Sequence, residues 1–447
     1  MRQLEKVRSL YDIAQIVISS LESAQQWQSH SWYHIEDQMV IACAHAGDME
    51  SAFAHRTRIT ENGGAPSPDA YGSLIECVKD TTDDTSNAMA LFRESQVVGC
   101  TPNVYLYNTI ISKLAKARKA DFALELFQQM KATLGLRPTS ITYGAVIAAC
   151  ARVGDAHSAE QLFAEMASQP NFKPRIPPYN TMMQLYTHTK PDRERVLYYY
   201  NALLDAGIQP SAHTYKLLID AYGTIEPVDI DAVQRVFSLV ETSSSVTLQG
   251  SHWASLINAW GCVKKDLNKA INVFASISQH PSSRRSKTPL PDAVTFEALI
   301  NVLVTHKRMD LAPTYVEQLQ RSGVHMTAYI ANLLIKGYAA AGDVEQARQI
   351  FEGLADPPSG MAAPNNHVPH EQSPPSPTTP PSSPMPSYRE PSTWEAMFRA
   401  ELGNGDRDRA VALLERLRER QFPPAVYNRI RGIMLDDSVS PWPASES

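Results

Sequence analysis

The sequence predicts an all-α fold, a right-handed α-solenoid of stacked helix-turn-helix repeats. Three observations lead to this prediction. An aromatic residue recurs every 36 residues, at Tyr71, Tyr107, Tyr143, Tyr179 and Tyr215. The apolar residues between these positions follow the period of an α-helix, and a glycine-aspartate pair recurs midway through several units. A fixed period of this length is typical of supersecondary units that stack on one another.

Length and composition agree with an extended array. A chain of 447 residues is longer than one globular core usually is. The formal charge of -6 argues against a uniformly basic coat for nucleic acid, although a local positive surface stays compatible with it. The five cysteines show no spacing suited to disulfides or zinc, and we interpret them as reduced core thiols. No run of about 18 apolar residues is present, so we expect no membrane span.

Each repeat is expected to contain two helices. In one unit the apolar residues Leu106, Ile110 and Leu114 lie on one helical face, and Leu126 and Met130 continue the pattern on a second helix. The turn between the two helices is marked by Gly-Asp, where glycine allows the turn and aspartate caps the second helix; the pairs begin at Gly47, Gly154, Gly342 and Gly405. Small residues five positions further on let paired helices approach closely, at Ala52, Ala123, Ala159, Ala312, Ala347 and Ala410.

Prolines close successive units, at Pro102, Pro138, Pro174 and Pro210. One hairpin cannot bury its own apolar stripe, whereas a stacked neighbour covers it, so stability is expected to accumulate along the array. Like-placed side chains of consecutive first helices are then expected to face one shared groove.

Composition divides the chain into five expected segments. They are an N-terminal helical cap (1–32), a helical repeat array (33–356), a disordered insertion rich in proline and serine (357–391), a C-terminal helical hairpin (392–434) and a flexible tail (435–447). A stretched loop at 281–291 carries Arg284, Arg285 and Lys287, for which we expect a solvated loop; a phosphate contact is the alternative.

The repeated pattern resembles the pentatricopeptide repeat family, most closely its degenerate fungal mitochondrial members. The clearest copies are "YNTIISKLAKARKADFALELFQQMKATLGLRP", "TYGAVIAACARVGDAHSAEQLFAEMASQPNFKP" and "NLLIKGYAAAGDVEQARQIFEGL". The tetratricopeptide relatives favour tryptophan and Leu-Gly in the first helix, which these copies lack. The resemblance implies a protein that binds single-stranded RNA at one base per repeat.

The resemblance also implies positions for the contacts. In the family, the residue after the aromatic and the last residue of the unit select the base, and the second residue of the unit stacks between bases. Carried onto this sequence, the RNA-binding candidates are Asn103, Tyr105, Asn108, Thr139, Ile141, Gly144, Arg175, Asn180, Ser211, His213, Lys216 and Asn332. Only Asn108, Asn180 and Asn332 match the favoured base-selecting residue, and Gly72, Gly144 and Ala254 offer no side-chain hydrogen bond. Each candidate stacking residue, Val294 among them, equally suits ordinary packing.

No catalytic pattern is found in the sequence. It lacks the HxE and paired CxxC of a zinc deaminase, an aspartate cluster suited to a metal-dependent nuclease and a glycine-rich phosphate loop. We therefore expect no enzyme activity, no cofactor, no metal and no small-molecule substrate.

Two functions remain open. The first is a mitochondrial RNA-binding protein that holds an organellar transcript or ribosomal RNA and affects its processing, stability or translation. The second is a protein scaffold associated with the mitoribosome or with respiratory-complex assembly. The mitochondrial location follows from the family resemblance, and net acidity with few base-selecting residues favours the scaffold.

Overall fold

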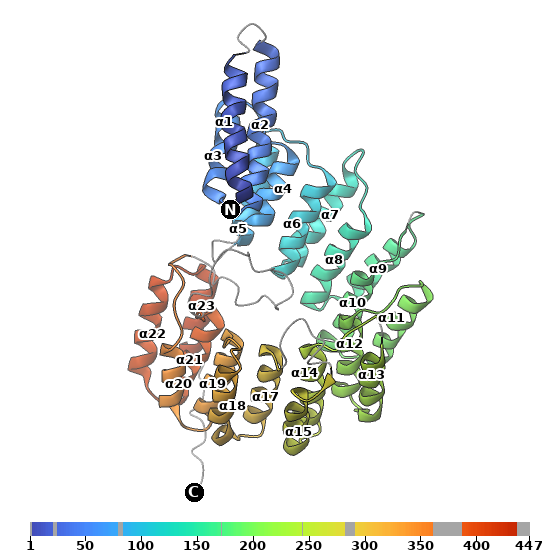
Figure 1. The fold of residues 1–447 in the computed structure, drawn as a ribbon, viewed down its shortest axis with the longest axis vertical. Coiled ribbons are helices and arrows are strands. Elements are labelled where there is room, and N and C mark those ends of the chain that lie inside the picture. The colour runs from blue at the N-terminus through green and yellow to red at the C-terminus, as the bar shows by residue number, and fades with distance from the viewer. Residues whose placement is uncertain are drawn as a thin grey trace. The chain divides into compact units, whose positions relative to one another are not determined.

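The computed structural model describes residues 2–20, 25–78, 84–170, 172–243, 245–281, 291–360 and 387–435. They fall into two units, Met1–Lys190 (unit 1) and Pro191–Ser447 (unit 2). Both units are built from stacked antiparallel helices, which confirms the predicted all-α solenoid (Figure 1). The predicted loop cations Arg284, Arg285 and Lys287 lie outside the described residues.

Unit 1 has two layers of helices. Its helices are α1 (Arg2–Ser19), α2 (Gln25–His45), α3 (Met49–Glu61), α4 (Pro68–Cys77), α5 (Asp84–Val97), α6 (Val104–Lys116), α7 (Ala120–Ala132), α8 (Ser140–Val153), α9 (Ala156–Ala167) and α10 (Ile176–Gln184), followed by the π-helical segment η1 (Leu185–Thr189). Helices α2, α4, α6, α8 and α10 pack successively on one another, and we call them the first-helix layer of unit 1. Helices α3, α5, α7 and α9 each pack on the first helix that precedes them.

Unit 2 repeats this arrangement. It contains α11 (Arg193–Asp205), α12 (Ala212–Thr224), α13 (Ile230–Thr242), α14 (Gly250–Asn258), η2 (Ala259–Val263), α15 (Leu267–Ile277), α17 (Ala293–Thr305), η3 (Met309–Leu311), α18 (Ala312–Arg321), α19 (Ala328–Ala340), α20 (Val344–Glu352), α21 (Pro391–Gly403), α22 (Arg407–Glu419), α23 (Pro424–Gly432) and η4 (Ile433–Leu435). Its first-helix layer consists of α12, α14, α17, α19 and α21, each in contact with the next.

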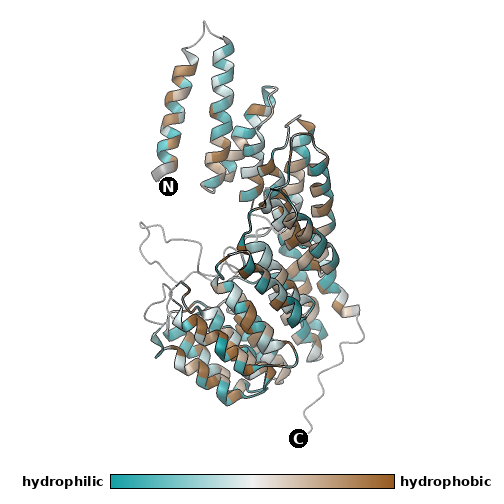
Figure 2. Cartoon of the chain, turned by 90° about the vertical axis from the view of Figure 1, so that its right-hand side faces the viewer, coloured by the Kyte–Doolittle hydropathy of each residue, from teal (hydrophilic) through white to brown (hydrophobic). Residues whose placement is uncertain are grey.

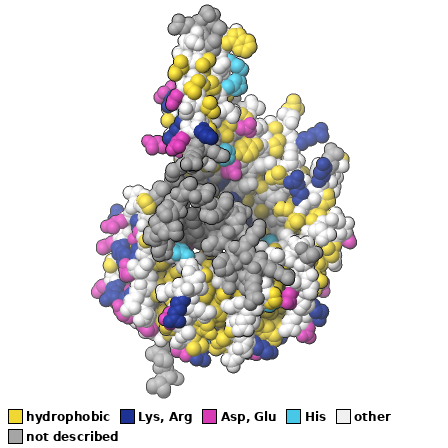
Figure 3. Space-filling model, viewed as in Figure 1, with side chains coloured by type: hydrophobic (Ala, Val, Ile, Leu, Met, Phe, Trp, Pro, Cys, Tyr) yellow, Lys and Arg dark blue, Asp and Glu magenta, His cyan; other side chains and the backbone are white. Residues whose placement is uncertain are grey.

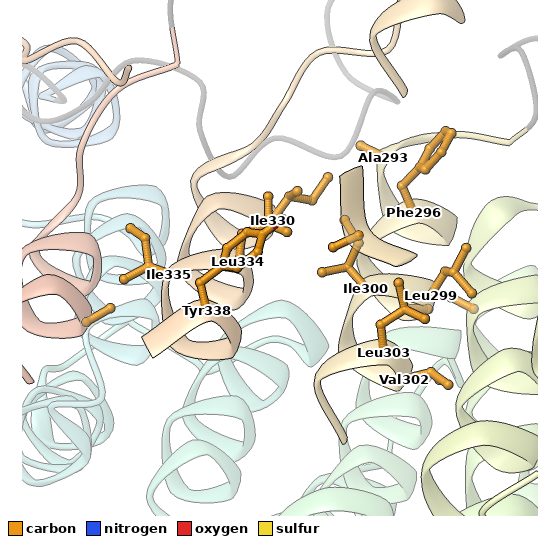
Figure 4. Packing of buried hydrophobic residues seen from close by; sticks show 14 of the residues in the cluster. Ala293, Phe296, Leu299, Ile300, Val302, Leu303, Ile330, Leu334, Ile335 and Tyr338 are labelled. Carbon is orange, nitrogen blue, oxygen red and sulfur yellow. The ribbon is translucent and has the colours of Figure 1, made fainter. Parts of the chain in front are cut away.

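Apolar stripes on these helices form the cores. Brown and teal residues alternate along single helices in Figure 2, as expected for amphipathic helices that bury one side. In unit 2, Ile300 of α17 faces Ile330 and Leu334 of α19, whereas Phe296 lies on the other side of α17, and all four are fully buried (Figure 4). Among the described helices, none combines the length and apolarity that a membrane crossing requires.

The regularly spaced aromatic residues join consecutive repeats. At six interfaces this residue packs edge-to-face on a phenylalanine of the preceding second helix, and the paired rings have centroids 4.8 to 5.8 Å apart: Phe92–Tyr107, Phe127–Tyr143, Phe163–Tyr179, Phe237–Trp253, Phe274–Phe296 and Phe351–Trp394. This is a favoured aromatic geometry. The aromatic period in the sequence therefore reflects one contact that recurs at these six repeat-to-repeat interfaces.

The predicted turn and helix-packing signals are confirmed. The glycines of the four Gly-Asp pairs have φ of 82° to 84°, a left-handed conformation that favours glycine. The aspartates that follow cap the second helices with their side chains, as Asp155 does by accepting a hydrogen bond from Ser158 N. All six predicted small residues have no exposed surface: Ala52, Ala123, Ala159, Ala312, Ala347 and Ala410.

Parts of the predicted segmentation differ from the helices of the structure. The limit between cap (1–32) and array (33–356) falls inside α2, because that helix runs through from Gln25 to His45. The segment 392–434 contains three helices instead of a hairpin. Both ends of the predicted insertion (357–391) are ordered; residues 361–386 lie outside the described part of the chain, as do residues 436–447 of the predicted tail.

The ends of that insertion are held together by specific contacts. Ala355 and Tyr388 form a short parallel bridge, and Gly360 N donates to the carbonyl oxygen of Arg420. Arg389 is buried; its Nε donates to Phe351 O at 2.9 Å and its guanidinium pairs with Asp356 at 2.8 Å. The chain thus returns to the stack where it left, so α21 packs directly on α19 and α20. Proline density indicated a loop but could not indicate how its base is closed.

His252 makes the stability of unit 2 depend on pH. It has no exposed surface; its Nδ1 accepts from Gln249 N at 3.0 Å and its Nε2 donates to Ala212 O at 2.9 Å. Burial lowers the pKa of His252, whereas in the unfolded chain we expect the ordinary value of about 6.5. The unfolded chain then binds the proton first as pH falls, so the free energy of unfolding decreases from about pH 7.5 downward, through about pH 6.5.

The measurement is thermal unfolding of the full chain between pH 7.5 and 5.5. We expect the transition of unit 2 to fall in temperature with pH, and the decrease to be smaller in His252→Gln, which cannot titrate. An equal pH dependence in the two proteins would contradict this role of His252.

Candidate nucleic-acid interface

The candidate residues occupy three fixed positions on the first helices. They stand at the N-cap before the helix, at its second residue and at its fifth residue; in α6 these are Asn103, Tyr105 and Asn108. Because the first helices pack successively within each unit, each position forms a row along its layer. The structure therefore brings the predicted residues together as rows within unit 1 and within unit 2.

Most side chains of the N-cap row form hydrogen bonds with the backbone of their own helix. The side-chain oxygens of Asn103, Thr139 and Ser211 accept hydrogen bonds from the amides of Leu106, Thr142 and Thr214. Such caps satisfy amides that have no partner within the helix. Asn103 also donates through Nδ2 to Asp69 Oδ1 at 2.8 Å. Arg175 differs, because it is exposed and makes no side-chain cap.

The second-residue row is solvent-facing and often apolar. Ile141 is 56% exposed, Val294 39% and Tyr329 44%, and His213 is exposed as well. Large apolar side chains at one repeated exposed position cannot be explained by a core, and they suit stacking against a planar ligand. Tyr329 was not among the predicted residues. It belongs to this row because it is the second residue of α19.

Tyr105 is the exception in that row. Its hydroxyl donates to Glu76 Oε2 at 2.8 Å, and its ring lies so close to Gly72 that a Cβ there would be 2.4 Å from Cε1. Burial and this hydrogen bond raise the pKa of Tyr105. Tyr105 therefore covers the fifth-residue position of α4 and is held within the protein.

The fifth-residue row contains the three candidate asparagines, which differ in burial and in hydrogen bonding. Asn108 is half-buried, and its Oδ1 is buried without accepting a hydrogen bond from any described residue. Asn180 and Asn332 are each only 7% exposed. Asn332 donates through Nδ2 to Ser392 Oγ at 2.9 Å, while its Oδ1 has no hydrogen-bond donor. A buried acceptor without a donor is costly, and turning either amide outward to a ligand that donates would relieve that cost.

The remaining fifth residues offer less to a base. Gly144 has no side chain; a Cβ there would lie 3.6 Å from Pro178. Lys216 forms an ion pair with Asp220 at 2.5 Å. Glu297 is half-buried, and burial raises the pKa of its carboxyl group. The row is therefore chemically uneven, with amides at some repeats, a carboxyl group at Glu297 and no side chain at Gly144.

Positive charge is concentrated at one hairpin turn of unit 1. Lys113 is paired with Asp84 at 3.6 Å, whereas Lys116, Arg118 and Lys119 are exposed and have no ion pair with a described residue. On α22, Arg416 pairs with Glu352 at 2.6 Å and Arg409 with Asp406 at 3.4 Å. Figure 3 accordingly shows acidic and basic side chains interspersed where α22 lies. In the described ranges, no group of histidine, cysteine, aspartate or glutamate could hold a metal ion.

Two family models match the chain. Residues 58–222 match the pentacotripeptide-repeat region of PRORP, and residues 229–354 match a model for pentatricopeptide repeat-containing protein.

One curated relative covers nearly the whole chain. Pentatricopeptide repeat-containing protein 5, mitochondrial, of Schizosaccharomyces pombe is 35% identical over 438 residues. The match covers 97% of this chain and 32% of that protein, so the chain spans about a third of the relative's length.

Two solved structures of RNA complexes are similar at low identity. Maize PPR10 with an 18-nucleotide psaJ RNA element is 14% identical, with a TM-score of 0.38 over 93% of this chain and 62% of that one. Yeast Rmd9p with a 16-nucleotide target RNA is 11% identical, with a TM-score of 0.38 over 91% of this chain and 88% of that one.

Proposed function

Because this chain belongs to the pentatricopeptide repeat family, we propose that it binds single-stranded RNA along its first-helix layers, without catalysis. In this proposal it acts in mitochondria, where occupancy of an organellar transcript affects processing, stability or translation. The name of the fungal relative, a mitochondrial pentatricopeptide repeat-containing protein, supports this choice.

The observation that carries the proposal is the unpaired acceptor of Asn108. Its Oδ1 is buried on the first-helix layer and accepts no hydrogen bond from the described residues. An amide recognises the edge of a base through one acceptor and one donor, and a matched pair contributes about 1 to 3 kcal/mol of discrimination. On the next first helix, the exposed Ile141 offers an apolar surface for the face of a base. Together, these two side chains support base binding at this repeat.

Replacing Asn108 by alanine is expected to separate RNA binding from stability. The preferred RNA is first selected from a random single-stranded pool with the full chain and sequenced. Its affinity for Asn108→Ala is expected to fall about 10-fold. The melting temperature is expected to stay the same or rise, because the substitution removes a buried polar group without a partner.

The matched control is Asn201→Ala, an exposed asparagine on α11 outside the first-helix layer. It should leave affinity and selected sequence unchanged. If Asn108→Ala binds the selected RNA like the wild type, Asn108 does not read a base. If the pool yields no bound RNA, the RNA-binding function is wrong.

A protein scaffold is the second candidate, favoured by Glu297 and Tyr105. A carboxyl group in the fifth-residue row would repel phosphate but would accept a hydrogen bond from a basic peptide, and Tyr105 already covers one position of that row. Partners in this case are the mitoribosome or a respiratory-complex assembly intermediate. Absence of selected RNA, together with a peptide whose binding is lost in Glu297→Gln, would favour the scaffold.

A further inference from the structure

The turns between first and second helices use two kinds of residue at the same backbone position. In seven hairpins the residue just before the N-cap of the helical segment that follows the turn has positive φ; after Lys307 this segment is η3. In four hairpins it is glycine, at Gly47, Gly154, Gly342 and Gly405. In three others it is Arg118 (φ 59°), Lys265 (φ 57°) or Lys307 (φ 55°). A side chain with a Cβ is disfavoured in this left-handed region, so these three hairpins retain a strained residue where glycine would be relaxed.

All three strained residues are cations that point to solvent. Arg118, Lys265 and Lys307 are exposed, and none forms an ion pair with a described residue. Further unpaired cations stand beside two of them: Lys116 and Lys119 beside Arg118, and Lys264 beside Lys265. Burial, followed by the charge of Arg118, lowers the pKa of Arg152 at the end of the next first helix. Like charges are thus held together at the turn of α6.

A purely structural reason for cations at this position is the helix dipole, since each of these residues follows the end of a first helix. That effect is available to a cation anywhere in the last turn, where no left-handed backbone is needed. Lys116, the last residue of α6, already provides it in the Arg118 hairpin. In that hairpin the dipole therefore does not account for a cation at the strained position itself.

We propose that Arg118, Lys265 and Lys307 bind the phosphodiester backbone of single-stranded RNA from these turn positions. The inference rests on the RNA-binding function proposed above and adds the residues that recognise RNA independently of its sequence. A cation that points outward and has no ion pair increases the affinity for RNA by contacting a phosphate and releasing its counterion. This makes binding depend on salt concentration. The backbone strain is retained because the left-handed turn carries the cation outward from the end of the first helix.

The test replaces each cation by glycine in the full chain: Arg118→Gly, Lys265→Gly, Lys307→Gly and the triple variant. The probe is a labelled random single-stranded RNA pool of about 24 nucleotides, with affinity measured at several salt concentrations. Each substitution should lower affinity about threefold, and lower the slope of log affinity against log salt by about 0.7. The melting temperature should rise by about 1 to 3 °C, because glycine relieves the backbone.

Two further variants keep charge and turn effects apart. Arg93→Gln removes an exposed cation without an ion pair from the second helix α5, and should leave the salt slope unchanged. Gly342→Lys places a cation at a left-handed turn with no atom within 4 Å of the new Cβ. It should steepen the salt slope and lower the melting temperature.

The outcomes separate this inference from the function on which it rests. If wild-type protein binds the pool and the triple variant keeps its salt slope, the turn cations do not contact phosphate and the inference is wrong, while RNA binding stands. If wild-type protein does not bind the pool at any salt concentration, both proposals fail.

Discussion

Replacing Phe296 by alanine is expected to lower the free energy of unfolding of unit 2 by about 3 to 5 kcal/mol. Phe296 has no exposed surface and packs edge-to-face on Phe274 at 5.1 Å. Figure 4 shows it on α17 near Leu299 and Leu303. The loss combines apolar burial, the aromatic contact and the cavity left behind, since a first helix between two neighbours cannot collapse freely.

Chemical denaturation of the full chain, followed by far-ultraviolet circular dichroism, measures this loss. The control is Leu239→Ala on α13, whose side chain is 51% exposed and should cost less than about 1 kcal/mol. Equal effects of the two substitutions would show that the aromatic contact between repeats does not carry the stability of unit 2.

Replacing Arg389 by alanine is expected to destabilise unit 2 by about 3 kcal/mol. Arg389 is 5% exposed, lies over the Phe351 ring at 4.6 Å and pairs with both Glu352 and Asp356. The substitution removes the donor to the Phe351 carbonyl oxygen and uncovers the aromatic pair that joins α20 to α21. Consequently the last helices should lose their attachment to the array first.

Hydrogen exchange of α21 and α22, measured alongside the denaturation midpoint, locates the effect. Arg399→Ala is the matched control, because that arginine is 51% exposed and pairs, among the described residues, with Glu395 four positions earlier; its cost should be below about 1 kcal/mol. Replacing residues 361–386 by a short glycine-serine linker should leave the midpoint nearly unchanged. A large loss from the linker and none from Arg389→Ala would refute the proposed closure at the base of this insertion.

The prediction of fold from sequence succeeded where the signal was local and repeated. The 36-residue aromatic period, the Gly-Asp turns and the buried small residues each predicted a feature found in the structure. The sequence did not predict segment boundaries where the period of apolar residues is weak. An example is α2, which starts before the first recognisable repeat. Proline content likewise could not distinguish the packed residue Arg389 from the rest of the insertion, because its burial depends on residues of α20.

The candidate interface shows the same division. Repeat position alone placed the candidate residues on three rows. It could not show which of them already form hydrogen bonds or packing contacts within the protein. Tyr105 is held by Glu76 and covers Gly72, whereas Asn108 keeps an acceptor without a donor. Candidate residues of one helix thus differ in whether contacts with the neighbouring repeat already engage them.

By itself, the sequence determined the helical hairpin, its turn and the direction in which each helix presents its side chains, since these follow from periodicity and capping within a few tens of residues. Only the tertiary structure decided which polar atoms stay unpaired, which cations stand in a left-handed turn and how the chain closes around its insertion. The physical reason is that hydrogen bonds, ion pairs and ring contacts of these residues are made with atoms of adjacent helices, and a spacing in the sequence does not specify those distances.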